Sequence, residues 1–516
     1  MRKNFRLIIL ICACAMPLSG MAQDDFEAFK KKADSEFSNY KKKAKDEFEE
    51  FRRKANEEYA DMVKKAWKEY RSLAGIPDPE DKVKPVPPKV YPKQDEKKPE
   101  PKPEPKPLPY DEVVTVPAPK PQPQPVVPIK EKPEPVKPQP VTPVTPPVKP
   151  KATFTYFGTE GQVRFNASNM VELSGVDEKS IAKAWKAMST STFDNLVFDC
   201  LQIRKEKNLC DWAYLEMLRA MAEHFCGKGT NKATLLMAYV YCQSGYKMRL
   251  ARDGQNKLFM LYGSEHVVYN QSYYTIEGLM YYPYNGAPKS LYVCNVAFPK
   301  ESTMSLYVPS EQQFAMKATD SKTRQSKRYP EVKTTMVSNK NLMDFYTTYP
   351  TSKLGENLVS RWAMYANTPL SQSVKDQIYP SLRQALNGCD ELTAVNKLLN
   401  YVQTGFVYEY DDKVWGHDRA FFAEESLFYP YCDCEDRSIL FTRLVRDLVG
   451  LDCILIYYPG HLASAVLFNK ADVTGDYILL NGKKFIVSDA TYINAPVGRT
   501  MPGMDNRAAK VIILER

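Results

Sequence analysis

The C-terminal part of the sequence carries a cysteine, a histidine and an aspartate in the order that thiol chemistry requires. Cys434 stands directly before a run whose apolar residues recur at helical spacing and which Gly450 ends, so we expect it at a helix N-terminus. Unpaired N–H groups and the positive end of the helix dipole stabilise a thiolate or an oxyanion there. His461 opens a later apolar run and Asp489 closes another. Together the three offer a nucleophile, a base and an orienting carboxylate.

Short apolar runs around the histidine predict antiparallel strands, and Asn481-Gly482 predicts a tight hairpin between the last two. If the final strand pairs antiparallel with the histidine strand, Asp489 lies beside His461. Residues 469–476 must then carry the chain back along a strand of about 23 Å, and eight extended residues reach roughly 26 Å. The loop is just long enough. The expected strands are Cys453–Tyr458, His461–Phe468, Asp476–Leu480 and Lys483–Asp489.

The blocks Cys432-Asp433-Cys434-Glu435-Asp436, Gly460-His461-Leu462 and Ser488-Asp489-Ala490 resemble the transglutaminase-like superfamily of papain-like thiol enzymes. The resemblance implies an α+β fold in which the helix carrying the cysteine packs on an antiparallel sheet carrying the histidine and the aspartate. It also implies that Cys434 is the nucleophile, His461 the general base and Asp489 the residue that orients the imidazole. The family often has a glycine and an aromatic residue where this chain has Cys432 and Ala463, and these departures concern substrate preference.

Each of these residues has a simpler interpretation. A lone cysteine before an amphipathic helix is usually buried or disulfide-bonded, and a histidine at a strand start is usually a polar edge residue. The ordered combination favours catalysis, because each chemical role is filled once and in a suitable local context. A zinc site of Cys432, Cys434 and His461 is a weaker alternative, because two sulfurs separated by one residue match the usual ligand spacing poorly. No metal or organic cofactor is required.

The N-terminus predicts export. A basic start precedes the apolar run Leu7–Met16, and Gly20-Met21-Ala22 offers small residues at a cleavage site, which is typical of a secretory signal peptide. We therefore expect a periplasmic, cell-envelope-associated or secreted protein. Removing Cys12 and Cys14 leaves nine of the eleven cysteines, which fits four disulfides and one free thiol.

Residues 24–74 repeat with a period of eleven residues, which predicts a long amphipathic helix in a straight or slightly right-handed assembly. Its aromatic stripe favours self-association as a bundle or coiled coil. Contact with a membrane surface is the alternative, which the near balance of acidic and basic residues weakens. The stripe consists of Phe26, Phe37, Phe48, Tyr59 and Tyr70, then Phe29, Tyr40, Phe51 and Met62, then Ala33, Ala44, Ala55 and Ala66.

Proline dominates residues 76–151, so this segment cannot form a core and should populate polyproline II. About 75 residues in this conformation reach at most about 230 Å. A spacer is favoured over a docking site for a proline-binding domain, because it is the commoner role of such segments. The expected organisation is a signal peptide (1–22), a repeat helix (23–75), a linker (76–151), a degenerate transglutaminase-like unit (152–300), connecting strands and helices (301–385) and a catalytic domain (386–516).

The degenerate unit is inferred from an internal repeat. Residues 231–263 align without gaps on residues 436–468, and Gly245 falls on Gly450. A chance match between two helix-and-strand patterns is the alternative. If the duplication is real, every catalytic position of the first unit is replaced, and this unit binds or supports but does not turn over substrate. The aligned pairs are Gly229 with Cys434, Asn256 with His461, and Asn285 with Asp489.

Between and around the two units, we expect strands over 291–307 and 314–336 and a helix over 374–406. His224 and His266 are expected to be structural or surface residues, and Trp415-Gly416-His417 to lie at the rim of the site.

The leading hypothesis is an exported cysteine peptidase or amidase that cleaves protein or peptide amide bonds through a thioester. A protein-crosslinking acyltransferase and a noncatalytic envelope or surface scaffold are the alternatives. The formal charge of +9 is spread over signal, helix and linker as well, so no nucleic-acid surface emerges.

Overall fold

The computed structural model describes residues 43, 50–77, 84, 87–90, 114–115, 152–286, 288–355, 360–470, 472–506 and 509–515. The predicted signal peptide (1–22) and most of the repeat helix lie outside these residues. Residues 55–516 group into one compact unit. Within the described ranges, no helix has both the length and the apolar character that crossing a bilayer requires.

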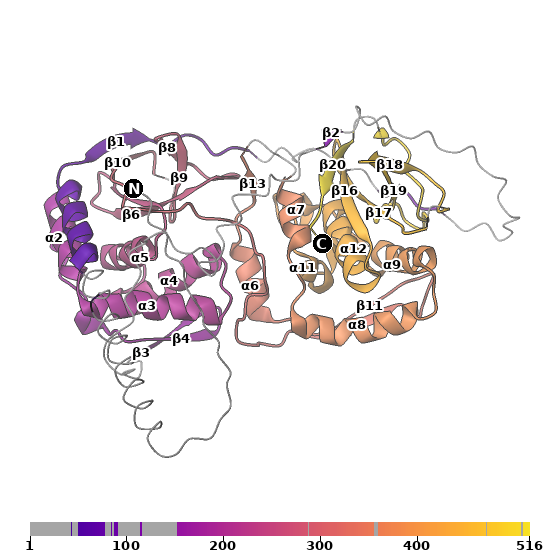
Figure 1. The fold of residues 1–516 in the computed structure, drawn as a ribbon, viewed down its shortest axis with the longest axis horizontal. Coiled ribbons are helices and arrows are strands. Elements are labelled where there is room, and N and C mark those ends of the chain that lie inside the picture. The colour runs from indigo at the N-terminus through magenta and orange to yellow at the C-terminus, as the bar shows by residue number, and fades with distance from the viewer. Residues whose placement is uncertain are drawn as a thin grey trace, which may run out of the picture. The chain divides into compact units, whose positions relative to one another are not determined.

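Helices and two six-stranded sheets confirm the expected α+β class (Figure 1). The first sheet has the strand order β1-β10-β5-β6-β9-β8, and α5 packs on β5 and β6 with α4 beside it. The strands are β1 (Trp67–Arg71), β5 (Met248–Arg252), β6 (Leu258–Ser264), β8 (Tyr274–Ile276), β9 (Leu279–Pro283) and β10 (Ser290–Cys294), and the helices are α2 (Glu178–Met188), α3 (Ser191–Glu206), α4 (Asp211–Cys226) and α5 (Asn231–Gln243).

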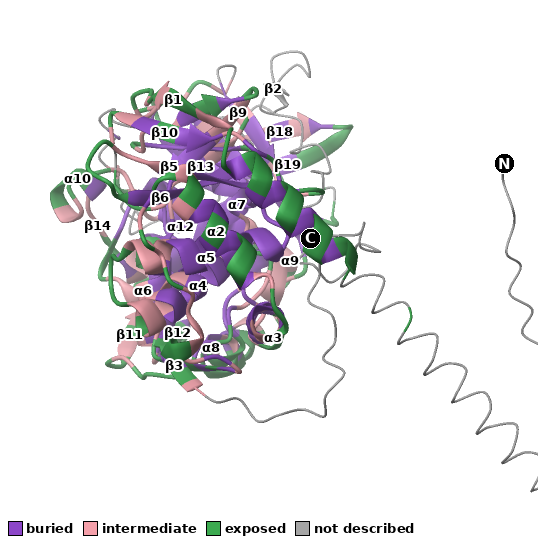
Figure 2. Cartoon of the chain, turned by 90° about the vertical axis from the view of Figure 1, so that its left-hand side faces the viewer, coloured by how far each residue is buried: buried purple, intermediate pink, exposed green. Residues whose placement is uncertain are grey.

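The second sheet has the order β18-β19-β17-β16-β20-β2 and carries the candidate site. Helix α12 packs on β16 and β17 and is enclosed by α7, α9 and α11. Like α5, it is buried over most of its length (Figure 2). The strands are β2 (Val114–Thr115), β16 (Asp452–Tyr458), β17 (His461–Leu467), β18 (Tyr477–Leu480), β19 (Lys483–Val487) and β20 (Lys510–Ile513), and the helices are α7 (Ser360–Asn367), α8 (Gln372–Leu386), α9 (Glu391–Gly405), α10 (Asp411–Val414), α11 (Ala423–Phe428) and α12 (Cys434–Leu448).

Shorter elements lie outside the two six-stranded sheets. The strands expected over 291–307 and 314–336 are much shorter than predicted, and the helix expected over 374–406 is divided into α8 and α9 near Gly388, whose φ is 74°. These shorter elements are β3 (Ala152–Tyr156), β4 (Thr159–Val163), the 3₁₀ helix Ala167–Asn169, β7 (His266–Val268), β11 (Lys322–Gln325), β12 (Lys333–Met336), α6 (Lys340–Thr348), β13 (Ser352–Leu354), β14 (Val407–Tyr408) and β15 (Tyr431–Cys432).

The two sheets are built alike, which supports an internal duplication over a chance alignment. Each sheet begins with an edge strand from the N-terminal segment, which is β1 in the first sheet and β2 in the second. The strands of each sheet that follow its central helix, α5 or α12, then come in the same spatial order, namely the fifth, first, second, fourth and third along the chain. The hairpins match as well, because Glu277-Gly278 and Asn481-Gly482 both have positive φ at both positions. Leu261 pairs with Pro283 and Ala465 with Val487, a shift of 204 residues on both strands.

The repeat helix ends earlier than predicted. Residues 50–63 are helical, but residues 67–71 form β1, which pairs antiparallel with β10. Tyr70, expected on the helical stripe, therefore belongs to a sheet. The physical reason is that β10 offers unpaired backbone groups, and β1 satisfies a full ladder of them.

The helical residues 55–63 pack into the core of the same chain. Tyr59 is fully buried, with its ring centroid 4.9 Å from that of Trp185 and 5.4 Å from that of Phe298. Met62, from the second row of the predicted stripe, is 43% exposed. Part of the aromatic stripe thus serves the fold itself, and self-association through residues 24–74 stays a prediction.

This packing predicts a large difference between two neighbouring substitutions. Tyr59→Ala removes a fully buried ring and should lower the free energy of unfolding by about 3–5 kcal/mol. Met62→Ala, on the exposed side of the same helix, should change it by less than about 0.5 kcal/mol. Urea unfolding followed by circular dichroism measures both, and equal effects would show that the helix does not depend on the burial of Tyr59.

The proline-rich segment is not only a spacer, which corrects the prediction for 76–151. Lys84 is buried, and β2 pairs parallel with β20. Val90 donates its N–H to the carbonyl of Ile493 at 2.8 Å, and Ile493 donates to the carbonyl of Pro88 at 3.0 Å. An extended segment without a core of its own can dock in this way, because it adds backbone hydrogen bonds to a folded partner.

The prediction of four disulfides is wrong for the described residues. All nine cysteines after residue 22 are free, and most are buried. Buried thiols behave as small apolar side chains, so packing accounts for them without pairing.

Candidate active site

The N-terminus of α12 is fixed by its own capping residues. Asp433 is the N-cap, and its N–H donates to Oδ2 of Asp436 at 3.2 Å. The other oxygen of Asp436 accepts from the N–H of Phe421 at 2.8 Å. Arg437 donates from its two terminal nitrogens to the carbonyls of Gln403 and Phe406 at 3.2 and 3.1 Å. Cys434 is the first residue of α12, as the sequence predicted, and these hydrogen bonds fix its backbone position.

Asp489 is held beside His461, which confirms the predicted strand geometry. The distance between Nε2 of His461 and Oδ2 of Asp489 is 2.9 Å. The other oxygen of Asp489 accepts from the backbone N–H groups of Thr491 and Tyr492 at 2.8 and 3.3 Å. Gln403 donates to the carbonyl of Asp489 at 3.0 Å and so fixes the backbone as well.

These contacts decide which nitrogen of His461 can act as a base. The two backbone donors keep the Asp489 carboxylate an acceptor, so Nε2 carries the hydrogen that lies between them. Nδ1 is buried and has no hydrogen-bond partner. The ring packs parallel to that of Tyr458, with an interplanar angle of 12°. His461 thus has a fixed ring orientation and one nitrogen, Nδ1, without a hydrogen-bond partner.

Cys434 reaches the same place from the helix. The N–H of Leu462, the residue after His461, lies close enough to the sulfur to lower the thiol pKa. Ser438, one turn further along α12, donates to the carbonyl of Leu462 at 2.9 Å. The start of α12 and the start of β17 are therefore joined through Leu462, the residue after His461.

The expectation of an accessible thiol with a low pKa is contradicted. Cys434 is 1% exposed and donates its S–H to Oε2 of Glu435 at 3.2 Å. Burial, followed by the carboxylates of Glu435 and Asp433, raises the pKa of the Cys434 thiol well above its usual value. Lys84 and the N–H of Leu462 act in the opposite direction without compensating. Burial and the two adjacent carboxylates therefore outweigh Lys84 and the N–H of Leu462.

Lys84 and four carboxylates form a buried charged cluster next to the cysteine. Nζ of Lys84 lies 2.8 Å from Oε1 of Glu435, 3.1 Å from Asp418 and 3.7 Å from Asp411, and it donates to Oδ2 of Asp433. Sequence reasoning missed this cluster, because Lys84 was assigned to a spacer. A signal was present in the acidic residues on both sides of Cys434, which require a cation when they are buried.

The segment around Trp415-Gly416-His417, expected at the rim of the site, contributes two flanking carboxylates to the cluster and not its aromatic rings. Asp411 and Asp418 from this loop enter the cluster. Trp415 instead packs edge-on against Phe421 and Tyr429, with Arg419 over its ring.

The structure thus pairs His461 with Asp489 and places Cys434 near Leu462, with Cys434, His461 and Asp489 each no more than 2% exposed. The chain matches no protein-family model, and no curated protein or solved structure matches it significantly. The assignment of roles therefore depends on the geometry of this site.

The zinc alternative receives no support from the described residues. Two groups there have ligand atoms close enough to share a cation, namely Asp433, Cys434 and Glu435, and Asp411, Asp418 and Glu435. Neither includes Cys432 or His461. Sγ of Cys432 lies 3.9 Å from the carbonyl of Val407, and Nε2 of His461 is taken by Asp489.

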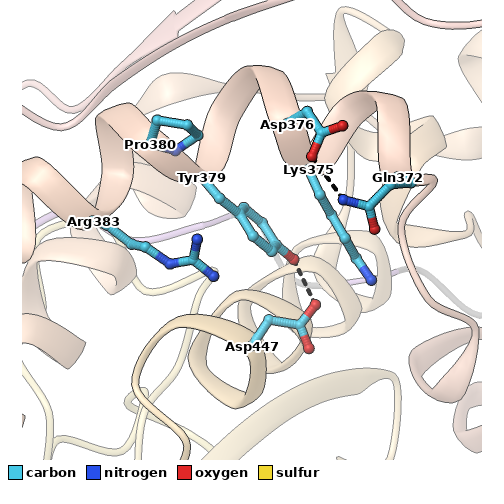
Figure 3. Close-up of a pocket in the computed structure, with 7 residues that line it drawn as sticks. All are labelled: Gln372, Lys375, Asp376, Tyr379, Pro380, Arg383 and Asp447. Atoms are coloured by element: carbon cyan, nitrogen blue, oxygen red, sulfur yellow. Dashed lines mark hydrogen bonds between the residues drawn. The ribbon is translucent and has the colours of Figure 1, made fainter.

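A hollow of about 400 Å³ lies elsewhere, between α8 and the C-terminal end of α12 (Figure 3). Tyr379 points across it and donates to Asp447 at 2.5 Å. Asp447 is thirteen residues beyond Cys434 on the same helix, which separates them by about 20 Å. This hollow is therefore not part of the candidate site.

The first unit has a cavity where the second has its triad. The cavity measures about 230 Å³ and is lined by Gly229, Lys257 and Asn285, among others. The strand register shifts by 204 residues and places Lys257, not Asn256, at the position of His461. Asn256 instead matches Gly460, and both have positive φ, 61° and 80°. In this register the three positions carry Gly229, Lys257 and Asn285, and the degeneracy of the first unit stays a prediction.

A graft tests whether the first unit can turn over substrate. Gly229→Cys in a Cys434→Ala background should show no activity, because neither the Lys257 ammonium nor the Asn285 amide replaces an imidazole and a carboxylate. The new side chain meets nothing within 4 Å, but φ of Gly229 is +70°. Gly229→Ala is therefore the control for backbone strain. Turnover by the cysteine variant alone would overturn the prediction.

Proposed function

We propose that this chain is a transglutaminase-like thiol enzyme that cleaves amide bonds of peptides or proteins through Cys434, His461 and Asp489. The observation that supports it best is the pair formed by His461 and Asp489, which leaves Nδ1 of His461 without a hydrogen-bond partner, while the buried Cys434 lies near Leu462, the residue after His461.

The chemistry follows from these positions. Nδ1 of His461 takes the proton of Cys434, and the thiolate attacks the amide carbonyl carbon to form a tetrahedral oxyanion. The C–N bond then breaks, His461 returns the proton to the leaving amine, and a thioester remains on Cys434. Water, deprotonated by His461, attacks the thioester and releases the acid and the thiol. The backbone N–H of Cys434 at the start of α12 is suited to stabilise both oxyanions.

The described state is a resting one. The Cys434 thiol donates to Glu435 and its pKa is raised. Catalysis requires that the influence of Glu435 on the sulfur be reduced when substrate binds.

Hydrolysis is preferred to protein crosslinking because crosslinking also requires a second channel that admits an amine and excludes water. A noncatalytic binding protein is the other candidate, and the burial of all three catalytic side chains favours it. The complete hydrogen bonding of Asp489 and the open nitrogen of His461 support the enzyme.

The test uses the full chain with a peptide mixture, with and without an isotopically labelled primary amine. Hydrolysis adds the mass of water across a cleaved bond, and acyl transfer adds the labelled amine. Unchanged masses at high enzyme concentration, with intact protein, would eliminate both enzymatic functions and leave the binding protein. Export and self-association through residues 24–74 remain parts of the same proposal.

A further inference from the structure

The cluster around Lys84 has more acids than cations. Asp411, Asp418, Asp433 and Glu435 surround the Lys84 ammonium, and Arg361 adds one further cation at 2.6 Å from Asp418. Oδ1 of Asp433 is buried and has no hydrogen-bond partner. Burial raises the pKa of Asp411 to about 7 and that of Asp433 well above its usual value. The cluster is therefore a site for positive charge.

The cation in this site comes from a distant and extended segment. We call Lys84 and residues 87–90 the strap. Besides the two backbone hydrogen bonds with Ile493, the side chain of Asn494 donates to the carbonyl of Val90 at 3.0 Å. The contact between Lys89 and Ile493 is a parallel β-bridge. Backbone pairing together with one anchored side chain is how extended peptides bind to folded domains.

The strap lies next to both ends of the catalytic group. Lys84 contacts Glu435, which accepts the hydrogen of the Cys434 thiol. Residues 88–90 pair with the loop that follows Asp489 and supplies the backbone donors to its carboxylate. A peptide bound in the position of the strap would therefore run past both Glu435, beside Cys434, and the loop that follows Asp489.

We propose that the four carboxylates form a binding site for the lysine side chain of an extended peptide substrate, and that the strap occupies this site as an internal substitute for that peptide. Calling this peptide a substrate rests on the proposed function, whereas the binding of a lysine-containing peptide to the four carboxylates does not. It assigns a substrate class, peptides with a lysine near the scissile amide, to the same site.

The pocket recognises the amine and does not activate it. Burial alone would lower the pKa of Lys84, but Asp433, Glu435 and Asp418 raise it well above its usual value. A protonated amine has no lone pair with which to attack a thioester, so this lysine is not an acyl acceptor. Its charge instead opposes Glu435 and Asp433 and lowers the pKa of the Cys434 thiol. A lysine in the pocket thus offsets part, but not all, of the effect of these carboxylates on the Cys434 pKa.

The test measures peptide binding in the Cys434→Ala background, where turnover cannot interfere. The probe is a fluorescent peptide with the sequence of residues 84–90, Lys-Pro-Val-Pro-Pro-Lys-Val, followed by fluorescence anisotropy. Lys84→Met in the full chain weakens the internal strap. The affinity of this variant for the probe should be at least about tenfold higher than that of the chain that keeps Lys84, because there the tethered strap competes with the probe at a high effective concentration.

Two substituted probes identify the side chain that matters. Norleucine in place of the first lysine should lower the affinity about ten- to a hundredfold, because a charge-assisted contact is lost. Norleucine in place of the second, which corresponds to the exposed Lys89, should change it by less than about twofold. Equal affinities for the two substituted probes would overturn the proposal.

Asn494→Asp is the second variant, for the case in which Lys84→Met does not fold. It removes the donor to Val90, leaves the carboxylates intact and tolerates the φ of 64° at this position. It should also admit the probe more readily than the parent chain, and unchanged binding would show that the strap does not block the pocket. If the probe binds as expected but restoring Cys434 gives no cleavage of lysine peptides, the proposed function fails and the pocket stands.

Discussion

Replacing Cys434 by Ala is expected to reduce peptide cleavage by at least about a thousandfold, because no other group can form the thioester. The variant keeps the helix start, since Asp433 still caps α12 and Arg437 still holds the carbonyls of Gln403 and Phe406. Initial rates with a lysine-containing peptide measure the effect. Intact-protein mass spectrometry during turnover should show an acyl adduct on the parent chain only.

Cys432 provides the matched control, because it is also buried and lies two residues earlier. Its sulfur faces the carbonyl of Val407. Cys432→Ala should keep activity within about threefold and lose a little stability, since only a small buried group is removed. A fully active Cys434→Ala protein, or an equal loss in both variants, would remove Cys434 from the mechanism.

Replacing Arg361 by Met is expected to lower the free energy of unfolding by about 3–5 kcal/mol. The guanidinium is completely buried, and Nη2 lies 2.6 Å from Asp418 and 3.7 Å from Glu435. Methionine conserves much of the volume but leaves both carboxylates with less compensation. Chemical denaturation of the full chain measures the loss, and adding Asp418→Asn should recover part of it.

The exposed ion pair of Lys340 and Asp344 is the control for the loss of a charge as such. Both side chains are nearly half exposed, at 45% and 47%. Lys340→Met should therefore change the free energy of unfolding by no more than about 0.5 kcal/mol. A similarly small effect of Arg361→Met would mean that the buried acids do not depend on this cation.

The sequence predicted those parts of the site that depend on local pattern and chain length. The helix from Cys434, the strand from His461 and the hairpin at Asn481-Gly482 are each specified within a few residues. The position of Asp489 beside His461 followed from the reach of the intervening loop. The α+β class followed from the same elements.

The remaining features depend on contacts between distant residues, about which local patterns carry no information. Lys84 and Asp433 are 349 positions apart, and a lysine in a proline-rich stretch is ordinarily solvated. The acids that raise the pKa of Cys434 were visible, but not their burial. Likewise, Trp67–Arg71 continued the pattern of the repeat helix, and only the open edge of β10 explains its extended form.

The two strands from the N-terminal segment also protect the fold from other chains. β1 covers an edge of the first sheet and β2 an edge of the second, and both precede residue 152. A chain that begins at residue 152 would expose the backbone of β10 and β20 to any strand that could add to them, which is a common route to aggregation. In the full-length protein, strands supplied by a long segment can also be exchanged between two molecules, so that each completes the sheets of the other. Concentrated samples would then contain intertwined dimers that dissociate only slowly on dilution.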